Sequence, residues 1–81
     1  MEFHRVELVR PEPDYILQVD FCSGEHKRYD IKPLFNKIDA FLGLKDIYGL
    51  YDLVKVDPGG YGISWNDEID LSCNELWENG Y

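Results

Sequence analysis

Alternating hydrophobic and polar residues dominate the first third of the chain and predict β-strands. Residues 3–10, FHRVELVR, alternate so that Val6 and Leu8 fall on one face and charged residues on the other, as in a half-buried strand. Pro11 and Pro13 follow and are expected to end this strand, because proline has no backbone N–H to donate. The pattern therefore predicts an N-terminal strand that stops before the prolines.

The same alternation recurs in residues 15–21, YILQVDF, and in residues 26–31, HKRYDI. The first of these segments places four apolar side chains on one face: Tyr15, Leu17, Val19 and Phe21. Ser23 and Gly24 lie between the two segments, where a tight turn would reverse the chain. We therefore expect the two segments to pair as the antiparallel strands of a hairpin.

Between residues 32 and 53 the hydrophobic period lengthens to three and four residues, which indicates a helix. The recurring apolar positions are Leu34, Phe35, Ile38, Phe41 and Leu42. Pro33 fits only the first turn of such a helix, and Gly43 and Gly49 interrupt the pattern. We therefore expect a short helix that ends before Gly43, followed by a second turn or helical piece near residues 46–51.

A second hairpin is predicted over residues 54–65, VKVDPGGYGISW. Pro58 presets the backbone at the first central position of a type II turn, and Gly59 can take the positive φ that the next position requires. The predicted order is then strand, hairpin, helical connection, hairpin and short helix. This order indicates one α+β domain over residues 1–81, a small two-layer structure with a mostly antiparallel sheet.

The last predicted element is a short helix over residues 73–78. Ser72 is a suitable N-cap, and Glu75 stands three residues later, as in a capping box. Gly80 follows at a position that suits the helix C-terminus. These signals explain part of an acidic segment that could otherwise be taken for a metal site.

Residues with recognisable chemistry are sparse. A calcium-loop template started at Asp70 or at Asn66 lacks the glycine and the final glutamate that it needs. His4, His26 and the two cysteines match no zinc spacing, and neither a nucleophile elbow nor a phosphate-binding glycine loop is found. We therefore assign no catalytic, cofactor-binding or metal-binding residue and expect no cofactor.

Two carboxylates near the C-terminus have no structural role in this scheme. Asp67 and Glu68 follow Trp65 and precede the predicted helix. Trp65 and Trp77 are themselves predicted to be core or sheet-packing residues, because a small domain must bury its large aromatic side chains. If the segment contains a site, it consists of Trp65, Asp67 and Glu68, which we take as a candidate interaction surface.

The charge narrows the classes of function. The 81 residues include 16 acidic and 8 basic ones, so the net charge of −8 repels phosphate backbones and anionic lipids. We expect no direct nucleic-acid binding, and no segment reaches the roughly 20 apolar residues of a membrane span. Cys22 and Cys73 have no CxxC spacing, and we expect no secretory leader. This pattern predicts a cytoplasmic protein with two free thiols; a Cys22–Cys73 bridge is the alternative.

Three segments carry a resemblance to a known family: Phe21–Ile31 (FCSGEHKRYDI), Gly60–Trp65 (GYGISW) and Asp70–Ser72 (DLS). Together with the HRV and PDY segments near the N-terminus, they make nearly the whole chain similar to the small bacterial proteins of domain-of-unknown-function family 2442 (DUF2442). The resemblance implies a compact α+β domain and supplies no catalytic residues. Such families occur beside genes for other small proteins, which suggests a toxin–antitoxin-like pairing.

Two hypotheses of function follow. The first is a non-enzymatic protein-interaction module, a monomer or weak oligomer, whose acidic surface binds a basic partner protein; an antitoxin-like role is one form of it. The alternative is a small metal-binding protein or enzyme that uses the acidic 65–70 region, with Asp67, Glu68 and Asp70 as ligands or acid/base groups. Metal ions that bind the second kind of protein would raise its melting temperature.

Overall fold

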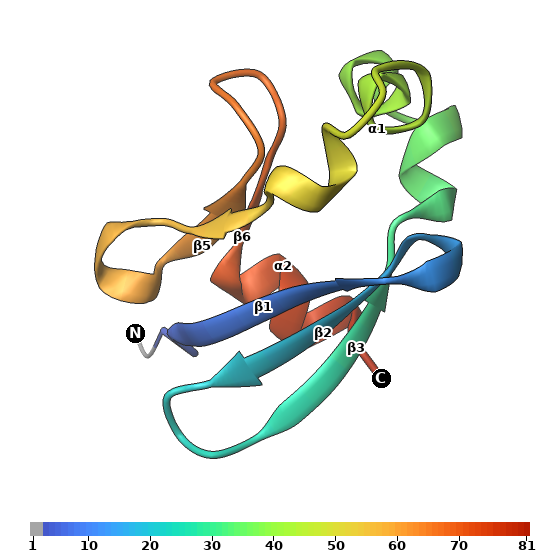
Figure 1. The fold of residues 1–81 in the computed structure, drawn as a ribbon. Coiled ribbons are helices and arrows are strands. Elements are labelled where there is room, and N and C mark those ends of the chain that lie inside the picture. Colours follow the sequence, from blue (N-terminus) through green and yellow to red (C-terminus); the bar gives the residue numbers. More distant parts are fainter. Residues whose placement is uncertain (1–2) are drawn as a thin grey trace.

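Two small three-stranded sheets and two short helices form an α+β domain in the computed structural model, which describes residues 3–81 (Figure 1). The predicted fold class is confirmed. The strands divide into an N-terminal sheet of order β1-β2-β3 and a C-terminal sheet of order β4-β5-β6, and all neighbouring strands are antiparallel. Across the described residues, every helix is too short or too polar to serve as a membrane span.

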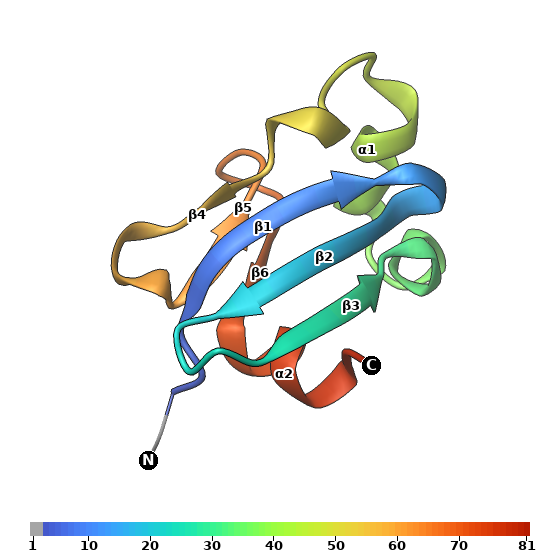
Figure 2. The same ribbon diagram turned by 60° about the horizontal axis from the view of Figure 1, so that its bottom comes forward.

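The N-terminal sheet contains β1 (Val6–Glu12), β2 (Ile16–Phe21) and β3 (His26–Asp30), which lie side by side in Figure 2. The predicted hairpin of β2 and β3 is confirmed, with Leu17 opposite Tyr29. The buried side chains of these two strands are Leu17, Val19, Phe21 and Tyr29. The alternating pattern thus located the buried face of this hairpin correctly.

Strand β1 differs from its prediction in two ways. The strand continues through Pro11, which pairs with Leu17, because β1 lies at the edge of its sheet, where a missing N–H is tolerated. The register also shifts between Val6 and Leu8. This bulge breaks the alternation, so Val6 and Val9 are buried whereas Leu8 is 45% exposed.

The predicted helix before Gly43 is not continuous. Its residues form two 3₁₀ helices, Lys32–Asn36 and Asp39–Leu42, separated by extended backbone at Ile38. Gly43 then begins α1 (Gly43–Asp46) instead of ending a helix. Short helices depend on tertiary packing, and the buried side chains of this segment are only Phe41 and Leu44, so no continuous apolar stripe holds one helix together. A further 3₁₀ turn, Tyr51–Leu53, leads to the second sheet.

The C-terminal sheet contains β4 (Lys55–Val56), β5 (Gly62–Ser64) and β6 (Asp70–Ser72). The predicted turn between β4 and β5 is confirmed, because Gly59 has φ of 81° and ψ of −7°, as the third residue of a type II turn requires. Strand β6 was not predicted, since three residues are too few to establish an alternating pattern. It extends the predicted hairpin into a three-stranded sheet.

Helix α2 (Cys73–Asn79) begins where the sequence predicts. The Ser72 hydroxyl oxygen accepts a hydrogen bond from the Glu75 backbone N–H at 3.1 Å, so the N-cap is confirmed. The Glu75 carboxylate does not complete a capping box; instead it accepts from the Tyr29 hydroxyl at 2.7 Å. Tyr29 is a partner on β3 that local spacing does not reveal. The side chain of Glu75 therefore links α2 to the N-terminal sheet.

The end of α2 is held against β3 by backbone and side-chain contacts. Gly80 has φ of −77°, so its role is not a left-handed exit; a Cβ there would collide with the Leu76 carbonyl oxygen. Tyr81 and Arg28 exchange two backbone hydrogen bonds of 2.9 Å. The Lys27 ammonium donates to the Trp77 carbonyl at 2.6 Å, where a cation suits the helix C-terminus.

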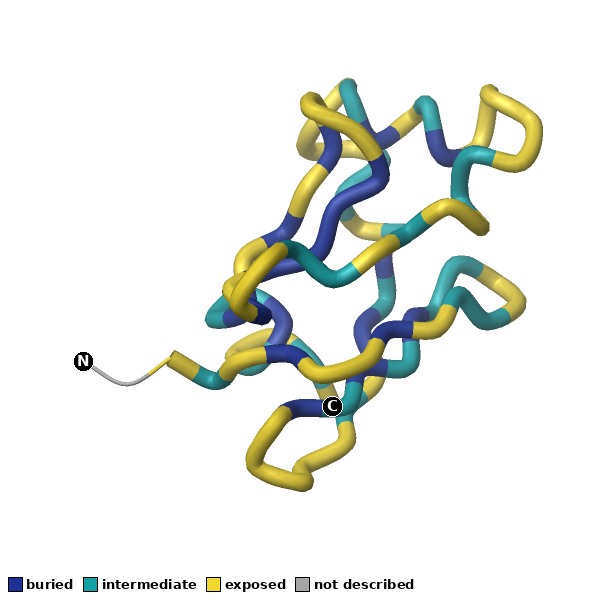
Figure 3. Tube along the Cα trace, turned by 60° about the vertical axis from the view of Figure 1, so that its left-hand side comes forward, coloured by how far each residue is buried: buried dark blue, intermediate teal, exposed yellow. Residues whose placement is uncertain are grey.

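The core lies where α2 and the two sheets face one another, and exposed loops surround it (Figure 3). Seven side chains have less than 2% of their surface exposed: Phe21, Leu17, Ile31, Ile63, Leu76, Val19 and Cys73. They come from both sheets and from α2, so neither sheet has a separate core. Cys73 is buried and Cys22 is exposed, and both are free thiols.

Gly60 sets the contact between the two sheets. It has φ of 79°, and a Cβ built on it would lie 2.5 Å from the Val6 carbonyl oxygen of β1. The turn between β4 and β5 can therefore approach the edge of the N-terminal sheet only because this residue has no side chain.

Gly60→Ala is expected to destabilise the protein more than Gly49→Ala. Gly49 has φ of 81°, but nothing lies within 4 Å of a Cβ added there. Both variants bear about 1–2 kcal/mol for the left-handed backbone, and Gly60→Ala adds about 1–3 kcal/mol for overpacking against β1. Urea denaturation of the two variants measures the difference. Equal losses in free energy of unfolding would contradict the role given to Gly60.

Candidate functional site

The first member of the predicted interaction surface lies in the core. Trp65 is 5% exposed, and its indole N–H donates to the Tyr51 carbonyl at 3.0 Å. The ring packs edge-on against Phe41, with centroids 6.1 Å apart. The prediction that Trp65 is a core residue is therefore confirmed, and its ring cannot contribute to a surface.

Asp67 and Glu68 are exposed at the tip of the hairpin that joins β5 and β6. The Asn66 side-chain oxygen accepts from the backbone N–H groups of Glu68 and Ile69, at 2.9 and 3.0 Å, and so closes the turn. Ile69 is buried and anchors the tip. The two carboxylates are thus presented to solvent on a defined loop, and their part in binding stays a prediction.

The metal-binding alternative requires several ligands in one place. Across residues 3–81, the structure brings together no group of three His, Cys, Asp or Glu side chains that could hold a metal ion. That alternative also stays a prediction.

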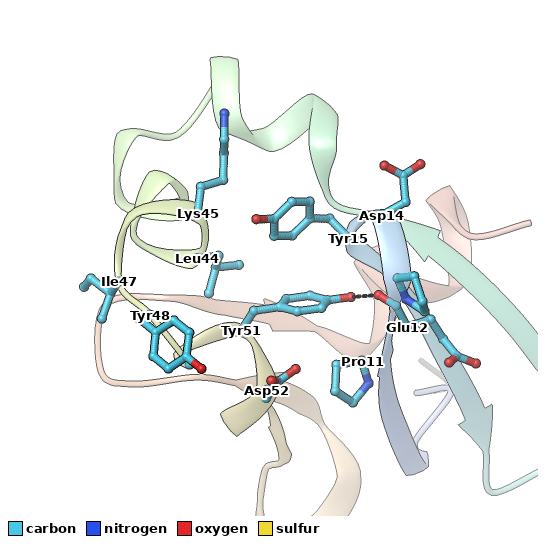
Figure 4. A pocket seen from close by; sticks show the side chains of 12 residues that line it. Pro11, Glu12, Asp14, Tyr15, Leu44, Lys45, Ile47, Tyr48, Tyr51 and Asp52 are labelled. Carbon is cyan, nitrogen blue, oxygen red and sulfur yellow. Dashed lines mark hydrogen bonds between the residues drawn. The ribbon is translucent and has the colours of Figure 1, made fainter.

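A large hollow lies away from this hairpin. It is a groove of about 540 Å³ between residues 11–15, which are the end of β1 and the turn after it, and residues 44–52 of the central connection (Figure 4). We call it the tyrosine groove, because Tyr15, Tyr48 and Tyr51 line it. Its size is that of a site for a small ligand or for a few side chains of a peptide.

The first wall is a turn with strained backbone. Asp14 and Tyr15 have φ of 65° and 58°, in the left-handed region that non-glycine residues seldom occupy. The Lys32 ammonium donates to the Asp14 backbone carbonyl at 2.7 Å. The Tyr15 ring packs edge-on against Phe35 and Tyr51, with centroids 5.2 and 5.1 Å apart. These contacts hold a conformation that costs about 1–3 kcal/mol per residue and that clusters at functional sites.

Tyr51 connects the two walls. Its hydroxyl group lies within hydrogen-bond distance of the Glu12 and Ile16 carbonyl oxygens, at 2.8 and 3.2 Å. Figure 4 shows this side chain reaching across the groove toward Glu12. The aromatic ring of Tyr51 is therefore fixed in orientation and forms the base of the groove.

The second wall contains the most exposed aromatic residue of the described chain. A β-turn closed by the Leu50 N–H and the Ile47 carbonyl, 3.1 Å apart, places Tyr48 and Gly49 at its tip. Gly49 has φ of 81°, which suits the third position of such a turn. Tyr48 is fully exposed, and Ile47 is 57% exposed. The turn thus holds two large side chains in solvent beside the groove.

Negative charge dominates the rim of the groove. Glu12, Asp14 and Asp52 line it, together with one basic residue, Lys45. Asp14 is paired with Lys32 at 3.2 Å, and the Lys45 ammonium lies 5.2 Å from the centre of the Phe35 ring. Figure 4 shows Lys45 turned away from the tyrosine rings and Asp52 turned toward the space between Tyr48 and Pro11. A cation would therefore be favoured in the groove over an anion.

The groove also affects the acidity of its tyrosine. Burial raises the pKa of Tyr51 to about 12, and the charges of Asp52 and Glu12 act in the same direction. The hydroxyl is thus neutral over the physiological pH range. It can therefore donate a hydrogen bond to the carbonyl oxygens of the opposite wall.

A second hollow, of about 490 Å³, lies at the other end of the domain around Trp77. The rings of His4 and Trp77 are stacked with centroids 3.7 Å apart and planes 4° apart, and Phe21 meets Trp77 edge-on at 5.0 Å. The Lys27 ammonium lies 4.3 Å from the centre of the Trp77 ring. Trp77 is therefore a sheet-packing residue, as predicted, and its ring is already covered by neighbours.

Sequence reasoning did not find the tyrosine groove. Its two walls come from segments about 30 residues or more apart, and for the second wall the sequence predicts only a turn or helical piece near residues 46–51. One signal was available: Tyr48 and Tyr51 flank Gly49 in a segment without a regular apolar period. Large aromatic residues outside any periodic pattern have no obvious place in the core, so they are candidates for a surface.

The fold and the groove define the class of this protein: a small acidic α+β domain with an aromatic groove. The chain belongs to the family described as protein of unknown function (DUF2442), whose model matches residues 6–81. The resemblance noted in the sequence is thereby confirmed over essentially the whole chain. No curated protein and no solved structure gives a significant match.

The raised pKa of Tyr51 predicts a loss of stability at alkaline pH. The unfolded chain releases this proton at about pH 10, whereas the folded chain keeps it to about pH 12. The contribution of Tyr51 is therefore complete below pH 10 and is lost as pH rises toward 12. Tyr51→Phe should be less stable at pH 7, by about 1 kcal/mol for the lost hydrogen bond, and should lose less stability above pH 10.

Urea denaturation of both proteins at pH 8, 10 and 11 measures this difference. Tyr29, whose pKa is also raised by burial and by Glu75, is present in both and contributes equally. Tyr48→Phe removes a fully exposed hydroxyl and is the matched control. A Tyr51→Phe protein with the same decline above pH 10 as the parent would contradict the assignment.

Proposed function

We propose that this protein is a non-enzymatic interaction module that binds a basic partner protein. The observation that carries the proposal is the combination of a net charge of −8 with an aromatic groove at which Tyr48 and Ile47 are exposed. Such a surface is expected to be covered by a partner, because tyrosine is enriched where binding energy concentrates in interfaces.

The placement of the exposed residues supports a protein partner. A defined turn holds Tyr48 fully exposed and leaves more than half of Ile47 exposed. Strained backbone at Asp14 and Tyr15 on the opposite wall costs stability and is typical of binding sites. A surface kept at such a cost has a function other than folding.

The charge supports a basic partner. Attraction between opposite net charges accelerates encounter and suppresses acidic competitors, so it favours the choice of one partner. An antitoxin-like role, in which the acidic chain neutralises a basic protein, is one form of the proposal. We place the encounter in the cytoplasm, because the two unbridged thiols suit a reducing compartment, and we propose a monomer or weak oligomer as the free form.

The partner can be captured on the immobilised protein from a lysate of the source organism, at about 0.05 M and at about 0.5 M salt. The expected result is a retained protein with an excess of lysine and arginine. It should elute at the higher salt, because screening by salt shortens the range of electrostatic attraction. Mass spectrometry identifies it. An unrelated acidic protein of similar charge and size is immobilised as the control for simple ion exchange. Recovery of no specific protein, or of an acidic one, would contradict the proposal.

A further inference from the structure

We propose that the tyrosine groove is the partner-binding site and that it holds an arginine side chain, with an apolar neighbour, from an extended segment of the basic partner. This inference rests on the proposed function and adds to it a place and a chemistry. It also excludes the hairpin tip of Asp67 and Glu68 as the main contact.

The aromatic surface suits a guanidinium group. Tyr48 is fully exposed, and the Tyr51 ring is fixed by the two carbonyl oxygens near its hydroxyl. A planar guanidinium group can lie on such rings, where the negative face of the aromatic system attracts a cation. Arginine is favoured over lysine because it stacks on aromatic rings and is more weakly hydrated.

The charge of the groove completes the match. Asp52 is exposed at the rim of the groove. Within residues 3–81, neither Asp52 nor Glu12 forms an ion pair. Lys45 is turned away in Figure 4 and lies over Phe35 instead. A cation stacked on Tyr48 would thus lie near an available carboxylate, while the Lys45 ammonium is held over Phe35.

The apolar residues of the groove are the reason that we propose an apolar side chain next to the arginine of the partner. Pro11, Leu44 and Ile47 line it, and a volume of about 540 Å³ exceeds what one arginine side chain fills. A leucine or similar side chain next to the arginine would cover these residues. A second copy of this chain fits less well, because two molecules of net charge −8 repel one another.

The test uses the full chain labelled with ¹⁵N and an acetylated hexapeptide that carries arginine flanked by leucines and glycines. We expect the amide signals of residues 44–52 and 12–16 to shift, with Kd on the order of 1 mM for so small a probe. A second peptide has citrulline, which is neutral and of the same shape, in place of arginine. It should bind at least about threefold more weakly, as the loss of one charged contact predicts.

Variants locate the contact. Asp52→Asn and Tyr48→Ala should each lower the affinity for the arginine peptide about two- to fivefold, as expected for the loss of one exposed ion pair or one cation–π contact. Both residues are exposed, so both variants should fold. Asp67→Asn is the matched control, because it changes the net charge by the same amount at the hairpin tip, and it should leave the affinity unchanged.

Several results would overturn the inference. They are the absence of any shift at 10 mM peptide, shifts centred on residues 66–69, equal binding of the citrulline peptide, or dimerisation through the groove in light scattering. Failure here is separable from failure of the proposed function. Suppose that a captured basic protein binds Asp52→Asn and Tyr48→Ala at full strength but no longer binds Asp67→Asn. That result would support the proposed function and contradict the groove as the binding site. If no basic protein is captured, the function itself fails.

Discussion

The hydrogen bonds of Tyr51 hold the parts of this domain in one arrangement. Its hydroxyl donates to the Glu12 carbonyl, 39 residues away, and also lies 3.2 Å from the Ile16 carbonyl. Its own carbonyl accepts from the Trp65 indole. One residue therefore connects the turn of the N-terminal sheet, the central connection and the C-terminal sheet. The groove between the first two parts exists because this side chain spans them.

That arrangement explains where the aromatic residues lie. A domain of 81 residues has few ways to bury large rings, and Trp65, Phe21 and Phe41 take the central positions. Trp77 is covered by His4 and Lys27 at one end of the molecule. The tyrosines of the groove lie at the opposite side of the core, where their rings are reachable from solvent. Their position is the reason that we propose the groove as the partner-binding site.

Some acidic residues connect parts of the fold, whereas others lie beside the groove and, among the described residues, form no ion pair. Glu75 links α2 to β3 through Tyr29, and Asp20 contacts both His26 and Arg10, at 2.8 and 4.0 Å. Hydrogen bonds from Gln18 and His26 lower the pKa of Asp20, as expected of a carboxylate held charged. Asp52 and Glu12 have no comparable partner within residues 3–81 and lie beside the exposed rings. The groove therefore has carboxylates that no ion pair in the described part of the chain neutralises.

The sequence by itself determined the local elements of this protein. Alternation located the hairpin of β2 and β3, Pro58 and Gly59 specified the turn between β4 and β5, and Ser72 marked the start of α2, because each depends on neighbours in the chain. Tertiary structure decided the rest. The bulge that exposes Leu8, the broken helix at Ile38 and the Glu75–Tyr29 bond all depend on contacts between distant segments. The groove belongs with these, since its walls are joined only when Tyr51 reaches β1, and no local pattern contains that contact.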